Sequence, residues 1–297
     1  MIETFSDIKE MKAALSAARE ASPLPILATV TFQENLRTLL GTGPEEACVI
    51  MEALGADLVG ANCSLGMEGT YEVFLRMRQV ARRGLVFRPN AGIPQLRNGR
   101  AVYPTSPEKM AQYALRMAQD GANVIGGCCG TTPAHLAAVI REVKGMTPTL
   151  RKVETATRLA GRTRMVTLGR GRIPVMVGER INPTGKKDLA QELREGRFAW
   201  IKNAAREQVE KGAGLLDVNV ASSGVNEPEA MKRAVLDLQR TVDVPLVLDS
   251  GNPAALEAGL RAADGKMVLN SVSGKVESLA TILPLASSSR MVRSLRT

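Results

Sequence analysis

Short apolar runs alternate with longer amphipathic stretches through the first half of this chain. Apolar runs of strand length fall at 25–31, 57–62, 85–89 and 122–127, and the opening IETF has the character of the end of another strand. Between them, apolar residues recur at helical spacing near 6–20, 44–54, 67–83, 106–120 and 133–144. Strands and helices in alternation predict a parallel sheet with helical crossovers.

The same alternation resumes in the second half. It predicts strands at 174–178, 214–220, 245–249 and 266–271, with helices near 188–211, 226–241, 253–262 and 275–285. Several strands of both halves end in a polar residue that is followed by a loop rich in Gly, Ser or Pro. Because ligands of parallel α/β folds bind beyond the carboxyl ends of the strands, these polar residues are the candidates for chemistry.

A basic, threonine-rich stretch at 146–172 separates the two patterns and predicts a linker, ordered in part where RLAG or RMVTLG packs. The predicted domains are therefore 1–145 and 173–297. A closed (β/α)8 barrel needs eight strands, whereas the first half offers four and a fragment and the second half offers four. We expect an α/β protein made of two incomplete (β/α)8 barrels that are joined by a basic linker.

Composition supports a folded protein of the cell interior. The 297 residues are 44% hydrophobic and 23% charged, which is enough apolar material for a sizeable core. No stretch resembles a signal peptide, and the longest uncharged run, 121–140, is interrupted by Gly, Pro, Thr, Asn and His. We expect no membrane association and a cytoplasmic location.

The net charge of +9 is concentrated in two segments. Residues 146–172 hold seven basic residues against one acidic residue, and 288–297 hold three Arg and no acid; the remainder balances 29 basic against 29 acidic residues. With nine aromatic residues in the chain and no nucleic-acid motif, we expect no nucleic-acid partner.

Three of the four cysteines follow predicted strands. Cys63 ends one strand, and the adjacent Cys128 and Cys129 end another two strands later. Three thiolates at one sheet edge suit a tetrahedral zinc with an open fourth position. Buried free Cys is also common as packing, so spacing alone leaves both interpretations open. Cys48 lies on an apolar helix face and is expected in the core.

Three ordered motifs in the first half carry a family resemblance: GANCSLG, RPNAGIPQLRNGRAVYPTSPE and IGGCCGTTPAHL. They resemble the carboxyl-terminal half of the homocysteine S-methyltransferase barrel. The resemblance implies that Cys63, Cys128 and Cys129 bind a catalytic zinc that activates the homocysteine thiol. It also suggests Glu3 near the homocysteine amino group and Asn90 near the metal, although Asn90 is equally well explained as a turn residue.

The second half contains VGERINPTG, LLDVNV, LVLDS and LNSVSG, which resemble the amino-terminal half of the pterin-binding barrel. The resemblance implies pterin contacts for the polar residues at these strand ends, Asp217, Asn219, Asp249 and Asn270. Asp and Asn also cap loops and helices, which is the alternative role for each of them. Glu179, Arg180 and Asn182 are weaker candidates, with a structural ion pair as the alternative for the first two. His135 is expected at the surface or in a helix cap.

A homocysteine barrel followed by a pterin barrel resembles the arrangement of the cobalamin-dependent methionine synthase family. The implied reaction is methyl transfer from 5-methyltetrahydrofolate through a corrinoid to zinc-bound homocysteine, giving methionine. The D-x-H-x-x-G corrinoid signature is absent, so methylcobalamin is expected on another domain or protein. The chain alone is then expected to be inactive. Two alternatives are a noncatalytic truncated remnant that at most binds zinc, and a split methyltransferase subunit that another chain completes.

Overall fold

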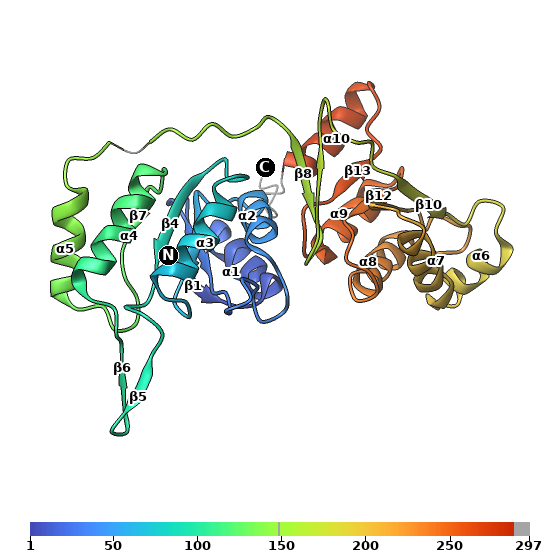
Figure 1. The fold of residues 1–297 in the computed structure, drawn as a ribbon. Coiled ribbons are helices and arrows are strands. Elements are labelled where there is room, and N and C mark those ends of the chain that lie inside the picture. The colour runs from blue at the N-terminus through green and yellow to red at the C-terminus, as the bar shows by residue number, and fades with distance from the viewer. Residues whose placement is uncertain (148, 288–297) are drawn as a thin grey trace. The chain divides into compact units, whose positions relative to one another are not determined.

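The computed structural model describes residues 1–147 and 149–287, which fold as two compact units divided at residue 154. Figure 1 shows helices and strands in both units. The basic segment at 288–297 that the charge pattern singled out lies outside the described residues.

The first unit is built on a five-stranded parallel sheet whose strands follow chain order. The strands are β1 (Ile2–Phe5), β2 (Leu27–Val30), β3 (Leu58–Asn62), β4 (Gly84–Arg88) and β7 (Val124–Ile125). The helices are α1 (Ile8–Ala21), α2 (Pro44–Ala53), α3 (Met67–Met77), α4 (Pro107–Gln119) and α5 (Pro133–Val143). These elements confirm the alternation predicted from hydrophobic spacing.

Helix contacts in the first unit also follow chain order. Each helix from α1 to α4 touches the next one, so the five helices form one layer along the sheet. This is the result expected when every crossover between neighbouring parallel strands is right-handed. The apolar residues between sheet and helices include Phe74 and Phe87, whose rings meet edge to face with centroids 5.2 Å apart.

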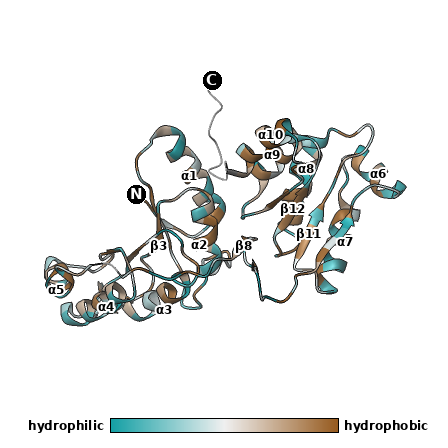
Figure 2. Cartoon of the chain, turned by 90° about the horizontal axis from the view of Figure 1, so that it is seen from above, coloured by the Kyte–Doolittle hydropathy of each residue, from teal (hydrophilic) through white to brown (hydrophobic). Residues whose placement is uncertain are grey.

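The second unit repeats this plan with four parallel strands in chain order. They are β10 (Val177–Ile181), β11 (Leu215–Val218), β12 (Leu246–Asp249) and β13 (Val268–Asn270). The helices are α6 (Lys187–Arg194), α7 (Ala199–Glu210), α8 (Glu227–Leu238), α9 (Pro253–Ala262) and α10 (Val276–Ser287). Figure 2 shows hydrophobic residues concentrated in strands such as β12.

Two boundaries of the second unit were predicted wrongly. The helix expected over 188–211 is two helices, because Gly196 takes a left-handed φ of 66° and the Glu192 side chain accepts a hydrogen bond from Trp200 N at the start of α7. Strand β10 begins three residues later than expected, in register with β11 at Val177 and Leu215. Glu179 and Arg180 therefore lie within the strand.

Two antiparallel hairpins complete the described fold. The first, β5 (Gln95–Arg97) with β6 (Arg100–Val102), is exposed and turns at Asn98-Gly99, both with positive φ. The second, β8 (Thr157–Ala160) with β9 (Met165–Leu168), lies in the stretch that was expected to be a linker. Within that stretch, the RLAG and RMVTLG sequences are thus ordered as paired strands.

The β8–β9 hairpin covers one face of the second sheet. Leu159 and Val166 of the hairpin form a buried cluster with Leu215 and Val247 of the sheet. Because side chains alternate along a strand, the same face carries Asp217 two residues after Leu215, and Asp249 two residues after Val247. This face therefore has an apolar layer under the hairpin and a polar layer at the carboxyl ends.

Neither parallel sheet closes on itself within the described residues. The α/β class with parallel sheets is thus confirmed. None of the helices in the described part of the chain has both the length and the apolar character that a bilayer crossing requires.

Substitution of Leu159 by Ala should destabilise the second unit by about 2–4 kcal/mol, because it leaves a cavity between the hairpin and the sheet. The fluorescence of Trp200, the single tryptophan of the chain, reports unfolding of this unit in denaturant. Leu150→Ala is the matched control, since Leu150 is 94% exposed, and its effect should stay within about 0.5 kcal/mol. Equal effects of the two substitutions would contradict the proposed packing of the hairpin.

Candidate functional site

The three predicted zinc ligands meet at the carboxyl edge of the first sheet. The sulfur atoms of Cys63, Cys128 and Cys129 all lie within 4.8 Å of one another, and Cys63 Sγ is 3.7 Å from Cys129 Sγ. Cys63 directly follows β3, and the cysteine pair follows β7. Cys63 and Cys128 are half-buried, whereas Cys129 is exposed, so the cluster is open to a ligand on one side.

Backbone hydrogen bonds fix the three loops that surround the thiols. Cys63 N donates to Arg88 O (3.1 Å), and Cys128 N donates to Pro89 O (2.9 Å), so both cysteine loops are tied to the end of β4. Ala91 N in turn donates to Cys129 O (2.9 Å). Cys63 also takes a left-handed φ of 63°, which turns the chain sharply away from the strand.

Asn62 is a buried amide that links the thiol cluster to two other strands. Its Oδ1 accepts hydrogen bonds from Thr4 N (2.9 Å) and Thr29 Oγ1 (2.6 Å), and its Nδ2 donates to Thr4 Oγ1 (2.7 Å). The same Nδ2 lies 3.8 Å from Cys128 Sγ and can donate to it. The sequence argument did not select Asn62, although it directly precedes Cys63.

The cluster fits a tetrahedral zinc. Zinc–sulfur bonds of about 2.3 Å at tetrahedral angles place the sulfur atoms about 3.8 Å apart. The 3.7 Å between Cys63 and Cys129 matches this value, and the 4.8 Å limit for the whole cluster requires only small side-chain rotations. Three soft thiolate donors are also the set that zinc accepts most readily.

Asn90 and Glu3, the two residues predicted to lie beside the cysteines, contact the loops around them. The Asn90 side chain is buried and its Oδ1 accepts from Cys129 N (3.0 Å), so it holds the cysteine loop in this structure. Glu3 on β1 forms an ion pair with Arg88, the residue whose carbonyl accepts from Cys63 N. Arg88 Nε is buried without a hydrogen-bond partner among the described residues, so this pair retains donor capacity.

Cys48 and His135 lie where they play structural roles. Cys48 is fully buried in the core, as predicted. His135 takes the capping role, one of the two expected for it, since its Nδ1 accepts from Thr132 N (3.2 Å) at the start of α5, and it is buried. Its Nε2 donates to Thr105 O (2.9 Å). Nothing in the neighbouring sequence indicates this buried hydrogen bond.

Amide and carboxylate side chains meet in pairs at the carboxyl edge of the second sheet. Asn219 Nδ2 donates to Asp249 Oδ2 (3.0 Å), and Asn270 Nδ2 donates to Asp217 Oδ2 (3.3 Å). The structure therefore brings together all four residues that the pterin resemblance selected. They are half-buried and present both hydrogen-bond donors and acceptors.

The second sheet edge is also crowded with negative charge. Burial raises the pKa of the Asp217 carboxyl above its ordinary value of 3.8, and the charges of Asp249 and Glu179 raise it further, against the amide of Asn270. Arg180 instead lies near Glu207 on the surface (3.6 Å), and Asn182 caps its own loop by accepting from Thr184 N (3.0 Å). Of the three weaker candidates, Glu179 is the one whose charge affects the pKa of Asp217.

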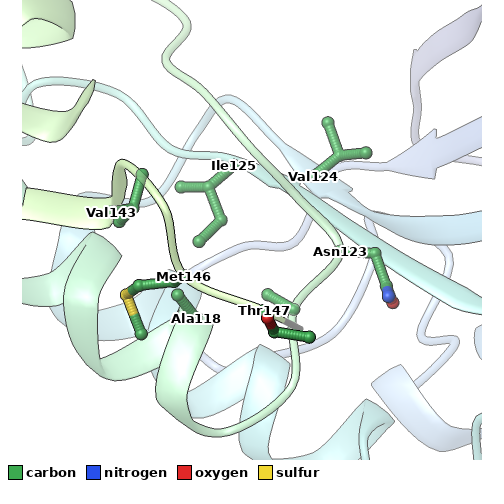
Figure 3. Close-up of a pocket in the computed structure, with 8 residues that line it drawn as sticks. Ala118, Asn123, Val124, Ile125, Val143, Met146 and Thr147 are labelled. Atoms are coloured by element: carbon green, nitrogen blue, oxygen red, sulfur yellow. The ribbon is translucent and has the colours of Figure 1, made fainter. Parts of the chain in front are cut away.

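Two cavities of about 340 Å³ each lie in the first unit. One is open to solvent and lies between α4, α5 and β7, and Figure 3 shows apolar side chains in its lining, including Ile125, Val143 and Met146. The other lies beside the thiol loops and is lined by Leu65 and Gly66, which follow Cys63, and by residues of the loop after Asn90. The thiols themselves line neither cavity.

Comparison with known proteins finds a matching family model in each unit. The model of the homocysteine S-methyltransferase family matches residues 1–143, and that of the pterin-binding enzymes matches residues 178–291. The chain is 31% identical to methionine synthase of Mycobacterium tuberculosis over 279 residues, and 32% identical to that of Mycobacterium leprae over 284. Nearly the whole chain is therefore similar to part of a methionine synthase. Both family matches agree with the resemblances inferred from the motifs.

Each of these alignments covers 92% of this chain but only 23% and 24% of the two relatives, so the chain spans about a quarter of their length. Among solved structures, (S)-3-O-geranylgeranylglyceryl phosphate synthase from Thermoplasma acidophilum matches 96% of this chain and 99% of its own. Its TM-score of 0.28 at 13% identity is too low to support an argument.

Replacing Asp217 by Asn should stabilise the second unit at neutral pH, by less than about 1 kcal/mol because the carboxyl is only half-buried. Since the native pKa of Asp217 is raised, the folded state holds this proton more tightly than the unfolded state. The destabilisation caused by ionised Asp217 is absent below pH 3.8, the ordinary pKa of the carboxyl. It grows as the pH rises from there to the native pKa and is complete above the native pKa.

In the Asp217→Asn variant, the free energy of unfolding should lose the pH dependence that Asp217 contributes. Denaturant unfolding followed by Trp200 fluorescence at a series of pH values measures it. The Asn side chain keeps an oxygen that can accept the Asn270 bond. Glu257→Gln on α9, an exposed residue paired with Arg261, is the control and should leave the pH profile unchanged. A variant that is less stable than the parent at pH 7 would show that repulsion at this edge is unimportant.

Proposed function

We propose that this chain carries two substrate sites of a homocysteine methyltransferase: a zinc and homocysteine site in the first unit and a methyltetrahydrofolate site in the second. The reaction served is methyl transfer from 5-methyltetrahydrofolate through a corrinoid to homocysteine, giving methionine. The observation that carries the proposal is the convergence of Cys63, Cys128 and Cys129 within 4.8 Å at one sheet edge. The two family matches support the same assignment.

In the first unit, the three cysteines would hold zinc through three sulfur donors and leave the fourth position to the substrate thiol. Zinc bound there would favour the thiolate form of homocysteine, which is the nucleophilic form. The backbone bonds from Cys63 and Cys128 to the end of β4 keep the donors in place before substrate arrives. Glu3 would receive the substrate ammonium group, with Arg88 as its partner when substrate is absent.

In the second unit, the paired amides and carboxylates would recognise the pterin ring. A pterin edge alternates donors and acceptors, and Asp217, Asn219, Asp249 and Asn270 offer the complementary groups. Ring N–H groups donated to Asp217 and Asp249 would relieve the excess of negative charge at this edge. Repulsion among these carboxylates would thus favour a ligand rich in hydrogen-bond donors.

The methyl carrier between the two sites would be a corrinoid that another domain or protein holds. We further infer that both sheets follow the (β/α)8 plan. Parallel strands in chain order with a single helix layer support this inference, as do the two family matches.

The reduced chain should bind about one zinc ion per molecule. Serine substitution of Cys63, Cys128 or Cys129 should each weaken binding on the order of 100-fold, because each removes one of three thiolate donors. Competition with a chelator measures the affinity, and metal analysis measures the stoichiometry. Cys48→Ala is the control, since Cys48 lies in the core and should leave zinc binding unchanged. Full zinc retention by the Cys63 variant would refute the site.

Homocysteine itself can be tested on cobalt-substituted protein, because the absorption bands of Co²⁺ report its ligands. Addition of homocysteine should change the spectrum as a fourth sulfur ligand joins, whereas homoserine, which lacks the sulfur, should not. The same change with both compounds would show that binding does not involve the thiol. No change with homocysteine, in protein that holds one cobalt per chain, would contradict the substrate assignment.

Substitution of Asp217 or Asp249 by Ala should weaken binding of 5-methyltetrahydrofolate about tenfold or more, since each removes a charged hydrogen-bond acceptor. Calorimetry with the reduced chain measures the dissociation constants. Glu229→Gln, on the exposed surface of α8, should change the affinity less than about twofold and is the matched control. Unchanged affinity in both Asp variants would place the folate elsewhere.

A further inference from the structure

Arg88 and Glu3 form an ion pair that crosses one face of the first sheet. Arg88 ends β4 and Glu3 lies on β1, and the strands β2 and β3 lie between them in the sheet. The methylene chain of Arg88 lies against Gly126, since a Cβ at Gly126 would come within 3.3 Å of Arg88 Cγ. The side chain of Arg88 therefore extends over the carboxyl end of the sheet and brings its guanidinium to the first strand.

This ion pair lies on the same sheet face as the residues that contact the thiols. Asn62 is opposite Arg88 in the register of β3 and β4, so their side chains point to the same face. Asn62 Nδ2 lies 3.8 Å from Cys128 Sγ and donates to Thr4 Oγ1 (2.7 Å). Thr4 directly follows Glu3 in the chain. Both members of the ion pair are thus next to Asn62, and Asn62 is next to the cysteine cluster.

Arg88 also has hydrogen-bonding capacity that the ion pair with Glu3 does not use. Its Nε is buried, and no residue that the structure describes accepts a hydrogen bond from it. A guanidinium presents its N–H donors in a planar fork that matches the two oxygen atoms of a carboxylate. The side chains of Arg88 and Glu3 are 23% and 45% exposed, so a small solute can reach both charges.

An α-amino acid carries an ammonium and a carboxylate on one carbon atom, which are the charges complementary to Glu3 and Arg88. When such a molecule inserts into the ion pair, Glu3 receives the ammonium and Arg88 receives the carboxylate. Every charge then has a partner. A thiol that carries an ammonium alone would displace Arg88 from Glu3 and leave the guanidinium without a counter-charge, which is unfavourable at a partly buried position.

We propose that Arg88 binds the carboxylate of the substrate while Glu3 binds its ammonium, and that this pair selects α-amino acid thiols over simple thiols. The inference rests on the proposed function, because the sulfur of the same ligand would occupy the open position on the metal. It adds a specificity-determining residue to the site, since Arg88 would distinguish ligands that differ only in the carboxylate. Arg88 takes part in no covalent step.

The test compares three thiols on the cobalt-substituted, 297-residue chain, with the Co²⁺ absorption bands as the measure of binding. They are homocysteine, 3-aminopropanethiol, which lacks the carboxylate, and 4-mercaptobutanoate, which lacks the ammonium. In Arg88→Met, homocysteine and 4-mercaptobutanoate should bind about tenfold more weakly, because each loses a charged hydrogen-bond donor. The affinity for 3-aminopropanethiol should be at least that of the parent, because Arg88 no longer competes for Glu3.

Glu3→Gln should show the opposite selectivity. Its affinity for 3-aminopropanethiol should fall about tenfold, since the ammonium loses a charged acceptor, whereas 4-mercaptobutanoate should bind at least as tightly as to the parent. Arg141→Met, an exposed position on α5, is the matched control for the lost positive charge and should leave all three affinities unchanged.

Equal losses for homocysteine and 3-aminopropanethiol in Arg88→Met, at one cobalt per chain, would show that Arg88 only supports the fold and would overturn the proposal. An unchanged affinity for homocysteine would overturn it as well. If Arg88→Met does not hold cobalt, Arg88→Lys allows the same comparison, because it keeps the charge but not the planar fork. A loss confined to the two carboxylate ligands supports the proposal, and an equal loss for all three contradicts it. A parent chain that holds cobalt but does not bind homocysteine would refute the proposed function, and this inference with it.

Discussion

The register of neighbouring parallel strands is the constraint on which both sites depend. Asp217 pairs with Val247, and Asp249 pairs with Asn270, so residues far apart in sequence reach the same height on the same face. The same register in the first sheet aligns Asn62 with Arg88 and places Cys63 directly beyond the edge. A shift of one residue in any pair would turn these side chains into the helix layer.

In each unit, the part of the sheet face next to the candidate site is covered or hydrogen-bonded. In the second unit, the β8–β9 hairpin covers the apolar layer at the amino ends, so the polar layer begins where the hairpin contact ends. In the first unit, the buried amide of Asn62 links Thr4 and Thr29 beneath the cysteines. One plan thus supports two chemistries, a soft sulfur set and an oxygen and amide set, which differ only in the side chains at the edge.

The sequence predicts the elements well because period 2 and period 3.6 differ clearly over most of the chain. It also selects the cysteines and the Asp and Asn residues at strand ends, whose position follows from the end of an apolar run. It fails where the determinant is a distant contact. Nothing near Tyr103 indicates that its ring lies on Gly130, and nothing near His135 indicates its bond to Thr105. The 95–102 hairpin was missed although its Asn98-Gly99 turn is a strong local signal.

Both edges gather several ligand groups close together, and we propose that the neighbours of these groups decide what each edge binds. Three sulfur atoms within 4.8 Å of one another offer a soft donor set for a metal cation. At the other edge, Asp217, Asp249 and Glu179 repel in the same way, but Asn219 and Asn270 already donate to two of the carboxylates. The carboxylates at this edge can still accept further hydrogen bonds, which the N–H groups of a neutral ring can supply. We therefore propose that the amides placed between the carboxylates would make the second edge a pterin site, whereas the first edge, with sulfur donors alone, would be a metal site.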